Sequence, residues 1–304
     1  MKELVVVSGK GGTGKTSIVA SFAVLARRAV LADCDVDASD LHLVLGPKVQ
    51  REEEFSGGSR AKIKSEVCVG CAKCQQLCRF DAILCDGPGN EFVEKTYRVD
   101  PLACEGCGVC AHFCPVGAVE FAPVVNGHWY VSETRCGPMV HARLGIAEEN
   151  SGKLVSLVRR EAKRVAEQQG LDLIVVDGSP GIGCPVIASI TASNLVLIVT
   201  EPTLSGLSDL ERVAQLTRHF GVETLVAINK SDLNPELSAE IESRAGARGL
   251  SVVGKVRYDR GVTRAQMNKQ AVVEYTAGGA SADVKRLWSA VAEKLNRSSP
   301  FVVL

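Results

Sequence analysis

Residues 9–16 read GKGGTGKT, and this stretch decides the fold. An apolar, β-branched run at 3–8 precedes it and predicts a buried strand, while apolar residues at helical spacing follow at 15–27. The stretch satisfies the pattern G-x-x-x-x-G-K-[ST] in the strand–loop–helix context that this pattern requires. We therefore predict a phosphate-binding loop, in which backbone N–H groups and a helix N-terminus form an anion pocket.

The side chains of this loop have separate expected roles. Lys15 is predicted to contact the β and γ phosphates, and the Thr16 hydroxyl is predicted to bind Mg²⁺. The pattern does not require Lys10. The simplest interpretation of this residue is an exposed lysine without a role. The residues expected to bind nucleotide are Gly9, Lys10, Gly11, Gly12, Thr13, Gly14, Lys15, Thr16 and Ser17.

Acidic residues follow two later apolar runs. The run at 29–32 leads into the acidic stretch 33–37, and the run at 171–176 ends at Asp177, before a Gly/Pro-rich turn. In P-loop proteins an aspartate at the end of a buried strand holds Mg²⁺, so we expect Asp177 near the metal. The acids at 33–37 have a simpler alternative, which is to cap a turn.

A further apolar run, at 225–228, ends in the sequence NKSD at 229–232. The pattern N-K-x-D recognises a nucleotide base, so Asn229 and Asp232 are predicted to bind the base. The motif alone leaves ATP and GTP open. A helix-capping turn ahead of Pro235 is the alternative.

Taken together, these motifs resemble the MinD, ParA, Mrp and nitrogenase iron protein superfamily of P-loop ATPases. The resemblance implies that the nucleotide is ATP, with Asn229 as the adenine contact, and that Asp35 orients or deprotonates the attacking water. It places Asp33 or Asp37 near Mg²⁺, of which we choose Asp33, and implies that Lys10 reaches the partner's nucleotide across a dimer interface. Lys10, Lys15 and Asp35 are therefore the expected catalytic residues, in a homodimer or in a heterodimer with a related ATPase.

Strands alternate with amphipathic helices along most of the chain. This alternation predicts an α/β fold, a mostly parallel sheet with helices on both faces as in P-loop NTPases. Helices are expected at 153–168, 207–219, 235–248 and 282–295, with Ser151 capping the first of them.

The composition indicates which partners and which cellular location to expect. Thirty-five basic residues balance 35 acidic ones, so charge gives no reason to expect nucleic acid as a partner. No run is long and apolar enough to span a bilayer, and the C-terminal SSPFVVL is not a basic amphipathic helix. We therefore expect a cytoplasmic protein without a membrane anchor.

Cysteine is concentrated in one region. Nine of the 12 cysteines fall at 68–114, and eight of these form two runs with the spacing C-x₂-C-x₂-C-x₃-C, the second followed by Pro115. In the cytosol, thiols kept reduced favour metal or redox chemistry over disulfides. The spacing is typical of bacterial two-cluster ferredoxins, whereas zinc sites usually pair two C-x-x-C hairpins.

In the two-cluster ferredoxin pattern, the fourth cysteine of each run binds the other run's cluster. We therefore expect two [4Fe–4S] clusters, one bound by Cys68, Cys71, Cys74 and Cys114, the other by Cys78, Cys104, Cys107 and Cys110. The remaining Cys34, Cys85, Cys136 and Cys184 are expected to be inert thiols, and a redox or ligand role stays open for Cys34, Cys136 and Cys184.

The cysteine runs interrupt the nucleotide-binding frame. The expected organisation is an ATPase domain at 1–59 and 123–304 with an inserted, small α+β ferredoxin-like domain at 60–122. Residues 137–144 are interpreted as a surface loop, whose His141 and Arg143 are polar because they are exposed. The alternative is that these two side chains face the clusters or a partner.

The expected function is a dimeric ATP-hydrolysing switch. It would couple its nucleotide state to electron transfer, or to delivery of a metal cluster, with a client metalloprotein or redox partner. One alternative is a positioning or assembly ATPase of the MinD/ParA kind with the clusters as redox sensor. Another is a ferredoxin-type electron carrier on a catalytically idle scaffold.

Overall fold

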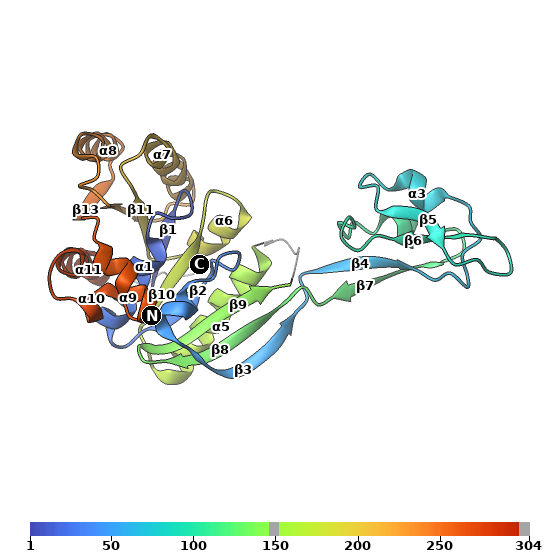
Figure 1. The fold of residues 1–304 in the computed structure, drawn as a ribbon, viewed down its shortest axis with the longest axis horizontal. Coiled ribbons are helices and arrows are strands. Elements are labelled where there is room, and N and C mark those ends of the chain that lie inside the picture. The colour runs from blue at the N-terminus through green and yellow to red at the C-terminus, as the bar shows by residue number, and fades with distance from the viewer. Residues whose placement is uncertain (146–151, 298–304) are drawn as a thin grey trace. The chain divides into compact units, whose positions relative to one another are not determined.

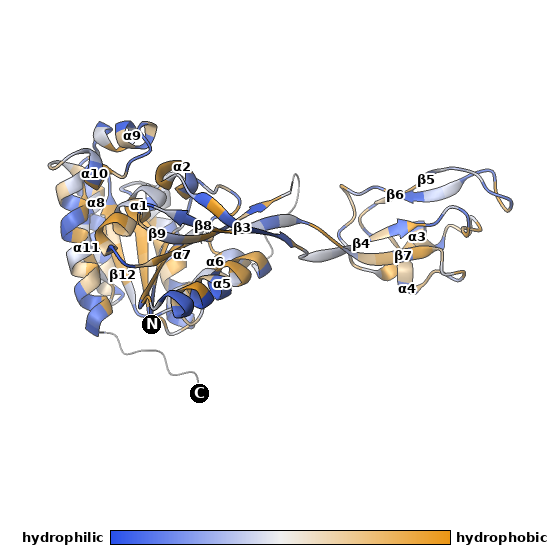
Figure 2. Ribbon diagram, turned by 90° about the horizontal axis from the view of Figure 1, so that it is seen from below, coloured by the Kyte–Doolittle hydropathy of each residue, from blue (hydrophilic) through white to orange (hydrophobic). Residues whose placement is uncertain are grey.

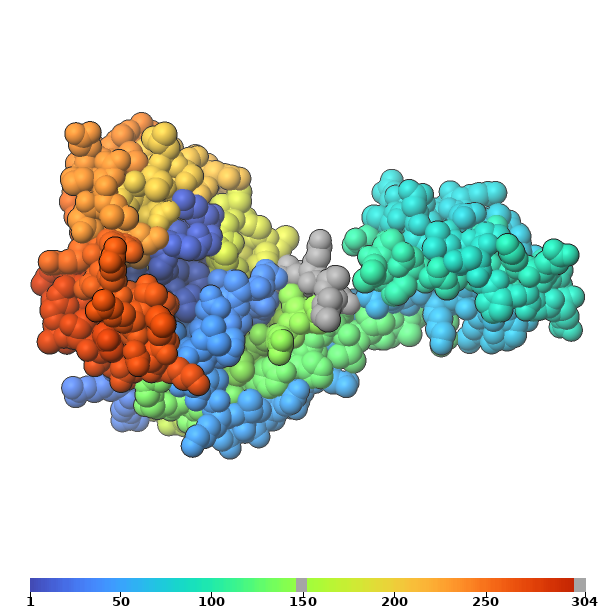
Figure 3. Space-filling model, in the orientation of Figure 1, coloured from blue at the N-terminus to red at the C-terminus, as the bar shows by residue number. Residues whose placement is uncertain are grey.

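The computed structural model describes residues 1–145 and 152–297, and Ser151 lies outside them. The chain forms two compact units. The sheet unit contains Met1–Glu53, Trp129–Leu144 and the described residues from 152 onward, and the cysteine unit contains Glu54–His128. Figures 1 and 3 show that the sheet unit combines the blue N-terminal residues with the yellow to red C-terminal half of the chain.

Across the described residues, nine strands form one sheet in the order β13-β12-β11-β1-β10-β2-β9-β8-β3. All neighbours from β13 to β9 pair in parallel, which confirms the predicted α/β fold. The strands are β1 (Lys2–Ser8), β2 (Val30–Asp33), β3 (Lys48–Phe55), β8 (Gly127–Thr134), β9 (Gly137–Leu144), β10 (Leu173–Pro180), β11 (Leu195–Thr200), β12 (Thr224–Asn229) and β13 (Ser251–Val256).

Helices cover both faces of this sheet (Figures 1 and 2). Alternate residues of β1 point to opposite faces, and Leu4 and Val6 join the core that also holds residues of α1 and α11. Helices α5 and α6 contact β2, β9 and β10. The helices are α1 (Lys15–Ala26), α2 (Leu41–Leu45), α5 (Lys153–Gln169), α6 (Cys184–Ile190), α7 (Leu204–His219), α8 (Pro235–Ala247), α9 (Arg260–Met267), α10 (Val272–Tyr275) and α11 (Ala280–Arg297).

Residues 137–144, interpreted from the sequence as a loop, are strand β9. Met139 and Val140 pair with Leu31 and Ala32 of β2 and are fully buried, so the strand extends the parallel sheet. The ring of His141 lies 2.9 Å from the Ser132 hydroxyl. Burial, with a smaller contribution from His42, lowers the pKa of His141 to about 4.

The cysteine unit is built from two antiparallel ribbons and two short helices. Strand β4 (Gly58–Ile63) pairs with β7 (Val119–Val124), and β5 (Ile83–Gly87) pairs with β6 (Thr96–Val99). The helices α3 (Lys73–Leu77) and α4 (Val109–His112) each begin inside one of the two cysteine runs.

The cysteine unit extends a few residues beyond 60–122 at each end. The backbone N–H of Asn126 donates to the carbonyl oxygen of Phe55 at 2.8 Å, and its side-chain oxygen accepts from the N–H of Gly57 at 2.9 Å. These bonds hold the two ends of the segment together. Among the described residues, the structure contains no helix with the length and apolar character needed to cross a membrane.

Candidate nucleotide and cluster sites

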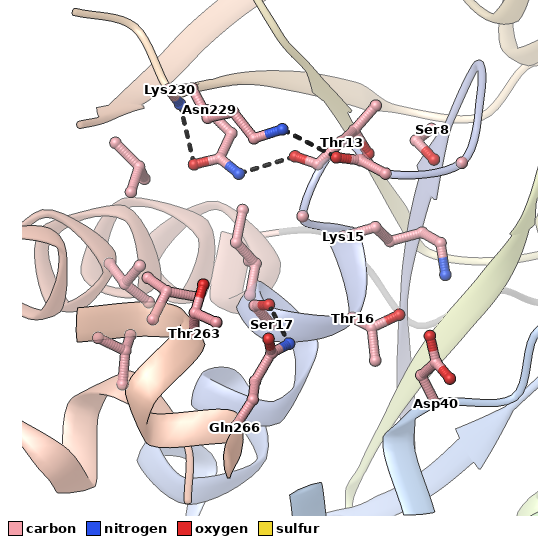
Figure 4. A pocket seen from close by; sticks show the side chains of 18 of the residues that line it. Ser8, Thr13, Lys15, Thr16, Ser17, Asp40, Asn229, Lys230, Thr263 and Gln266 are labelled. Atoms are coloured by element: carbon pink, nitrogen blue, oxygen red, sulfur yellow. Dashed lines mark hydrogen bonds between the residues drawn. The ribbon is translucent and has the colours of Figure 1, made fainter. Parts of the chain in front are cut away.

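A cavity of about 430 Å³ lies at the end of β1 where the chain turns into α1 (Figure 4). The loop between them and the start of α1 contribute one part of the wall, and the segments that follow β2, β12 and β13 contribute most of the rest. Residues in the wall include Gly11, Gly12, Thr13, Gly14, Lys15, Thr16, Ser17, Asp35, Asp40, Asn229, Lys230, Val256, Arg257, Tyr258, Asp259, Val262, Thr263 and Gln266.

Two glycines of the loop are required by close packing. Gly14 has φ +87°, and a Cβ there would collide with the side-chain amide of Asn229. A Cβ at Gly9 would collide with Asp209 on α7. The loop therefore keeps its shape because glycine lets neighbouring segments approach its backbone.

Lys15 lies among three aspartates at the buried end of the cavity. Its ammonium pairs with a carboxylate oxygen of Asp177 and lies 3.2 Å from Asp35 Oδ2. Asp33 and Asp177 are paired residues of β2 and β10, and Asp33 accepts a hydrogen bond from the Ser39 hydroxyl at 2.7 Å. The parallel register thus gathers residues that lie up to 162 positions apart.

The strand that carries Asp177 is longer than the sequence indicates. We expected it to end at 176, but β10 continues to Pro180, which pairs with Ser8 across an irregularity in β1. Asp177 is therefore held inside the sheet, between β1 and β2, instead of at the start of a free turn.

The charges at this end of the cavity are unbalanced. Burial raises the pKa of Asp33 to about 8, with a further contribution from Asp177. Burial also raises the pKa of Asp35, although Lys15 opposes this. Burial works against the charged form of Lys15, but Asp177 and Asp35 outweigh it and raise the pKa of the lysine. One cation faces three carboxyl groups.

Several buried oxygens in this site have no hydrogen-bond partner among the described residues. They are Thr13 Oγ1, Asp35 Oδ1 and Asp177 Oδ2. Buried polar atoms without partners are rare, and carboxylate and hydroxyl oxygens are the ligands that Mg²⁺ prefers, directly or through water. The donor set therefore fits a magnesium ion beside a phosphate group.

Asn229, which was predicted to bind the base, and its neighbour Lys230 brace the loop. The side-chain amide of Asn229 donates to the Thr13 carbonyl oxygen at 2.7 Å, and the Lys230 ammonium donates to that of Gly12 at 2.9 Å (Figure 4). Asp232 does not appear in the described wall of the cavity and accepts a hydrogen bond from the Tyr258 N–H at 2.6 Å. Asp232 does not cap α8 either, because the N-cap residue of that helix is Asn234.

Sequence reasoning missed the wall formed by 256–259 and α9. Gln266 on this helix donates to the Ser17 hydroxyl at 2.9 Å, beside the start of α1. The signal was present: an apolar run at 251–256 followed by a charged loop is the pattern that identified the other strand ends.

Lys10 lies outside the described wall of the cavity and contacts its own chain. Its ammonium is 2.8 Å from Glu201 Oε1 and 2.8 Å from the Ser205 hydroxyl. The other Glu201 oxygen lies 2.8 Å from Lys230. Burial opposes ionisation of Glu201, but Lys10 and Lys230 lower its pKa. Glu201 was also missed, although it follows a buried strand, as Asp177 was expected to do.

In the cysteine unit, each expected set of four cysteines lines one cavity. Cys68, Cys71, Cys74 and Cys114 line one of them, together with Ile63, Val69, Ala72, Tyr97, Pro115, Val116, Ala118 and Val119. Cys78, Cys104, Cys107 and Cys110 line the other, together with Ala61, Phe80, Ala82, Ile83, Val99, Glu105, Gly106, Gly108 and Val109. Both cavities are thus walled mainly by thiols and apolar side chains.

The two cysteine loops repeat the same backbone conformation. Gly70 and Ala72 in the first loop and Gly106 and Gly108 in the second all have positive φ, at matching positions. A Cβ at Gly106 would also collide with the carbonyl oxygen of Ser59. The internal repeat of the sequence is therefore a repeat of structure.

The donor chemistry fits an iron–sulfur cluster. Within the described residues, no three His, Cys, Asp or Glu side chains converge closely enough to hold a single metal ion. Four thiols around an apolar hollow suit a larger inorganic core, which thiolates bind as ligands. Cys114 Sγ accepts a hydrogen bond from the Ala118 N–H at 3.2 Å. Burial opposes the thiolate, but this and other backbone N–H groups lower the pKa of Cys114.

The remaining cysteines differ in exposure. Cys34 and Cys136 are buried, while Cys85 and Cys184 are exposed. Burial raises the pKa of the Cys34 thiol well above its usual value, which makes it a poor nucleophile.

The family model of the "CobQ/CobB/MinD/ParA nucleotide binding domain" matches residues 4–272. The chain belongs to this family. An uncharacterized protein of Methanocaldococcus jannaschii is 33% identical over 236 residues, 76% of this chain and 79% of its own length. A solved structure, the septum site-determining protein MinD of Pyrococcus horikoshii complexed with Mg-ADP, has the same fold, with 18% identity, a TM-score of 0.54 and 95% of each chain covered.

Part of this CobQ/CobB/MinD/ParA chain is also similar to a protein of another kind. An uncharacterized polyferredoxin-like protein of Methanocaldococcus jannaschii is 28% identical over 114 residues, 33% of this chain and 66% of its own length. The family match supports a nucleotide in the sheet unit.

Proposed function

We propose that this chain is an ATP-hydrolysing switch that acts as a dimer and carries two [4Fe–4S] clusters. Its nucleotide state would control electron transfer, or the delivery of a metal cluster, to a client metalloprotein or redox partner. One observation carries the proposal: the same chain holds Lys15 among aspartates with buried oxygens that have no hydrogen-bond partner among the described residues, and two cavities lined by four cysteines each.

In the nucleotide site, the chain's own groups would divide the work. Backbone N–H groups of 9–16 would surround the phosphates, and Lys15 would neutralise charge at the β and γ positions. Asp35, whose Oδ1 has no partner among the described residues, would position the attacking water or accept its proton. Thr16, Asp177 and Asp33 would hold Mg²⁺, directly or through water.

At the base end, Asn229 and the segment 256–259 line the described wall. The Asp232 carboxylate, which would read guanine in an N-K-x-D motif, is bonded to the backbone of Tyr258. This arrangement favours adenine over guanine and supports ATP as the nucleotide. Asp232 would then act on the base indirectly, by holding the 256–259 segment in place.

In the cysteine unit, Cys68, Cys71, Cys74 and Cys114 would hold one cluster, and Cys78, Cys104, Cys107 and Cys110 the other. When bound, such clusters supply one-electron redox chemistry. The chain runs from Asp35 through α2 and β3 into this unit, so a change around Asp35 has a short covalent route to it. This route supports the coupling.

The position of Lys10 is an argument for the proposed dimer. Lys10 would exchange Glu201 for the phosphates of the nucleotide in a second chain, which is either a copy of this one or a related ATPase. Its side chain is 33% exposed, so this exchange requires little disruption of the core.

The test is iron and sulfide analysis of anaerobically purified protein, combined with ATP hydrolysis rates with and without reductant. We expect about eight iron atoms per chain and a rate that changes with cluster oxidation state. The Cys107→Ser variant, with about half the iron, should lose this redox dependence. Full cluster content with an ATP hydrolysis rate that does not change with reductant would refute the coupling. Zinc in place of iron would refute the clusters.

A further inference from the structure

A groove of about 570 Å³ runs along the cysteine unit between its two β ribbons. Strands β4, β6 and β7 form its sides, and residues before and after β6 form its rim. The lining residues are Arg60, Ala61, Lys62, Ile63, Ser65, Pro88, Tyr97, Arg98, Val99, Pro101, Glu120, Ala122 and Val124.

The floor of this groove is also the wall of both cysteine cavities. Ile63 and Tyr97 line the groove and the cavity of Cys68, Cys71, Cys74 and Cys114. Ala61 and Val99 line the groove and the cavity of Cys78, Cys104, Cys107 and Cys110. Since Ala61 and Tyr97 are only 5% and 8% exposed, one layer of side chains separates the groove from each set of thiols.

Basic side chains outnumber acidic ones in the described lining of the groove. Arg60, Lys62 and Arg98 line it, and Glu120 is the only acidic residue in its described lining. Glu120 lies 3.8 Å from Lys64, outside the groove, and Arg98 is paired with Asp86 at 2.8 Å. Lys62 projects from β4 opposite Glu120, without an ion pair to it.

We propose that this groove is where the cysteine unit exchanges electrons with an acidic protein, a one-electron carrier with carboxylates around its own redox centre. The inference rests on the proposed function, because it requires clusters in the two cavities. The groove offers a short path to both sets of thiols, and its charge selects an anionic surface.

The exchange makes and breaks no covalent bond. One electron passes across the floor of the groove, the reduced member of the pair is oxidised by one electron, and the other is reduced by one. Electron-transfer encounters are weak and bury small interfaces, and their rates depend on electrostatic steering. A groove of this size and charge suits such an encounter.

Binding is tested first, on the cluster-loaded full chain, with a fluorescent oligoglutamate peptide as the probe. We expect binding that weakens as salt is added, and a loss of affinity of about tenfold in Lys62→Glu. Lys62→Gln, which places no carboxylate opposite Glu120, should lose a smaller part. Lys95→Glu makes the same change at an exposed lysine outside the groove, and should bind the peptide like the wild type.

Electron transfer is tested with two small oxidants of opposite charge, the iron(III)–EDTA anion and the hexaammineruthenium(III) cation. Oxidation of the reduced clusters by the anion should slow about tenfold in Lys62→Glu, and oxidation by the cation should not slow. Equal effects of Lys62→Glu and Lys95→Glu would overturn the proposal. So would tighter binding of a single-stranded DNA of equal charge than of oligoglutamate, because the groove would then serve a nucleic acid.

These readouts separate the groove from the proposed function. Protein without iron would refute the clusters, while peptide binding would still report on the charge of the groove. Cluster-loaded protein with no charge preference at Lys62 would refute the groove alone.

Discussion

The two candidate sites of this protein are built in opposite ways. The nucleotide cavity collects residues from Ser8 to Val284, at the ends of strands that belong to a large buried core. The cysteine cavities use residues from Ala61 to Val119, on tight loops over a small core cluster formed by Cys68, Ile83, Tyr97 and Ala118. We therefore expect the sheet unit to hold its site by itself, and the cysteine unit to depend on the proposed clusters to complete its interior.

Removal of the clusters is expected to produce the largest difference between the two units. Chelation of the iron should unfold β4–β7 and β5–β6, because the hollows lined by thiols then have nothing to pack against. The sheet unit should keep its structure. Hydrogen exchange measured by mass spectrometry checks this, since amides of 58–124 should lose protection while those of β1, β10 and β11 retain it. Equal loss in both units would show that the sheet unit also depends on the clusters.

Lys15→Ala should remove most of the activity of the sheet unit. Loss of a cation aimed at the phosphates lowers hydrolysis by about 100-fold or more. Iron content should stay as in the wild type, because none of the eight expected cluster cysteines appears in the described wall of this cavity. Lys95→Ala provides the control for loss of a lysine charge. Hydrolysis near the wild-type rate in Lys15→Ala would mean that this cavity is not the site of the reaction.

Stability of the sheet unit should fall as the pH rises in the absence of Mg²⁺. The folded-state pKa of Asp33 is about 8, and an unfolded aspartate titrates near about 4. Between these values the unfolded chain has released the proton that folded Asp33 retains, so stability decreases as the pH rises from about 4 to about 8. Thermal unfolding at several pH values measures this slope.

Asp33→Asn is the matched variant for that slope. The amide retains an oxygen for the hydrogen bond from Ser39 and does not titrate, so the decline with pH should become shallower. Added Mg²⁺ should also reduce the decline, because a cation favours the ionised carboxylate. Identical slopes for the variant and the wild type would show that Asp33 does not carry the effect.

The smallest effect is expected at Glu201. In Glu201→Gln the ion pairs to Lys10 and Lys230 are lost, but the bond from Lys230 to the Gly12 carbonyl remains. Because the Lys10 side chain is one-third exposed, the unfolding free energy should change by less than about 1 kcal/mol. Chemical denaturation measures this, and a much larger loss would make Glu201 a structural residue of the loop.

Local sequence signals predicted the α/β fold and the elements around the nucleotide cavity. The expected strand at 225–228 and helix at 235–248 agree with β12 and α8 within a residue at each end. Such elements were predictable because apolar periodicity and glycine placement act over a few residues. Strand β9 was missed because Gly137 and Pro138 suggest a turn, whereas pairing with β2 on one side and β8 on the other makes the segment a strand.

By itself, the sequence determined the glycine-rich loop after the first strand, the alternation of strands and helices and the spacing of the cysteines, because each depends on residues close together in the chain. Only the tertiary structure decided that Lys10 pairs with Glu201, that Asp232 bonds to Tyr258, and that Ile63 and Tyr97 form both a cavity wall and a groove floor. These pairings join segments distant in sequence. They follow from strand order and close packing, which no local pattern encodes.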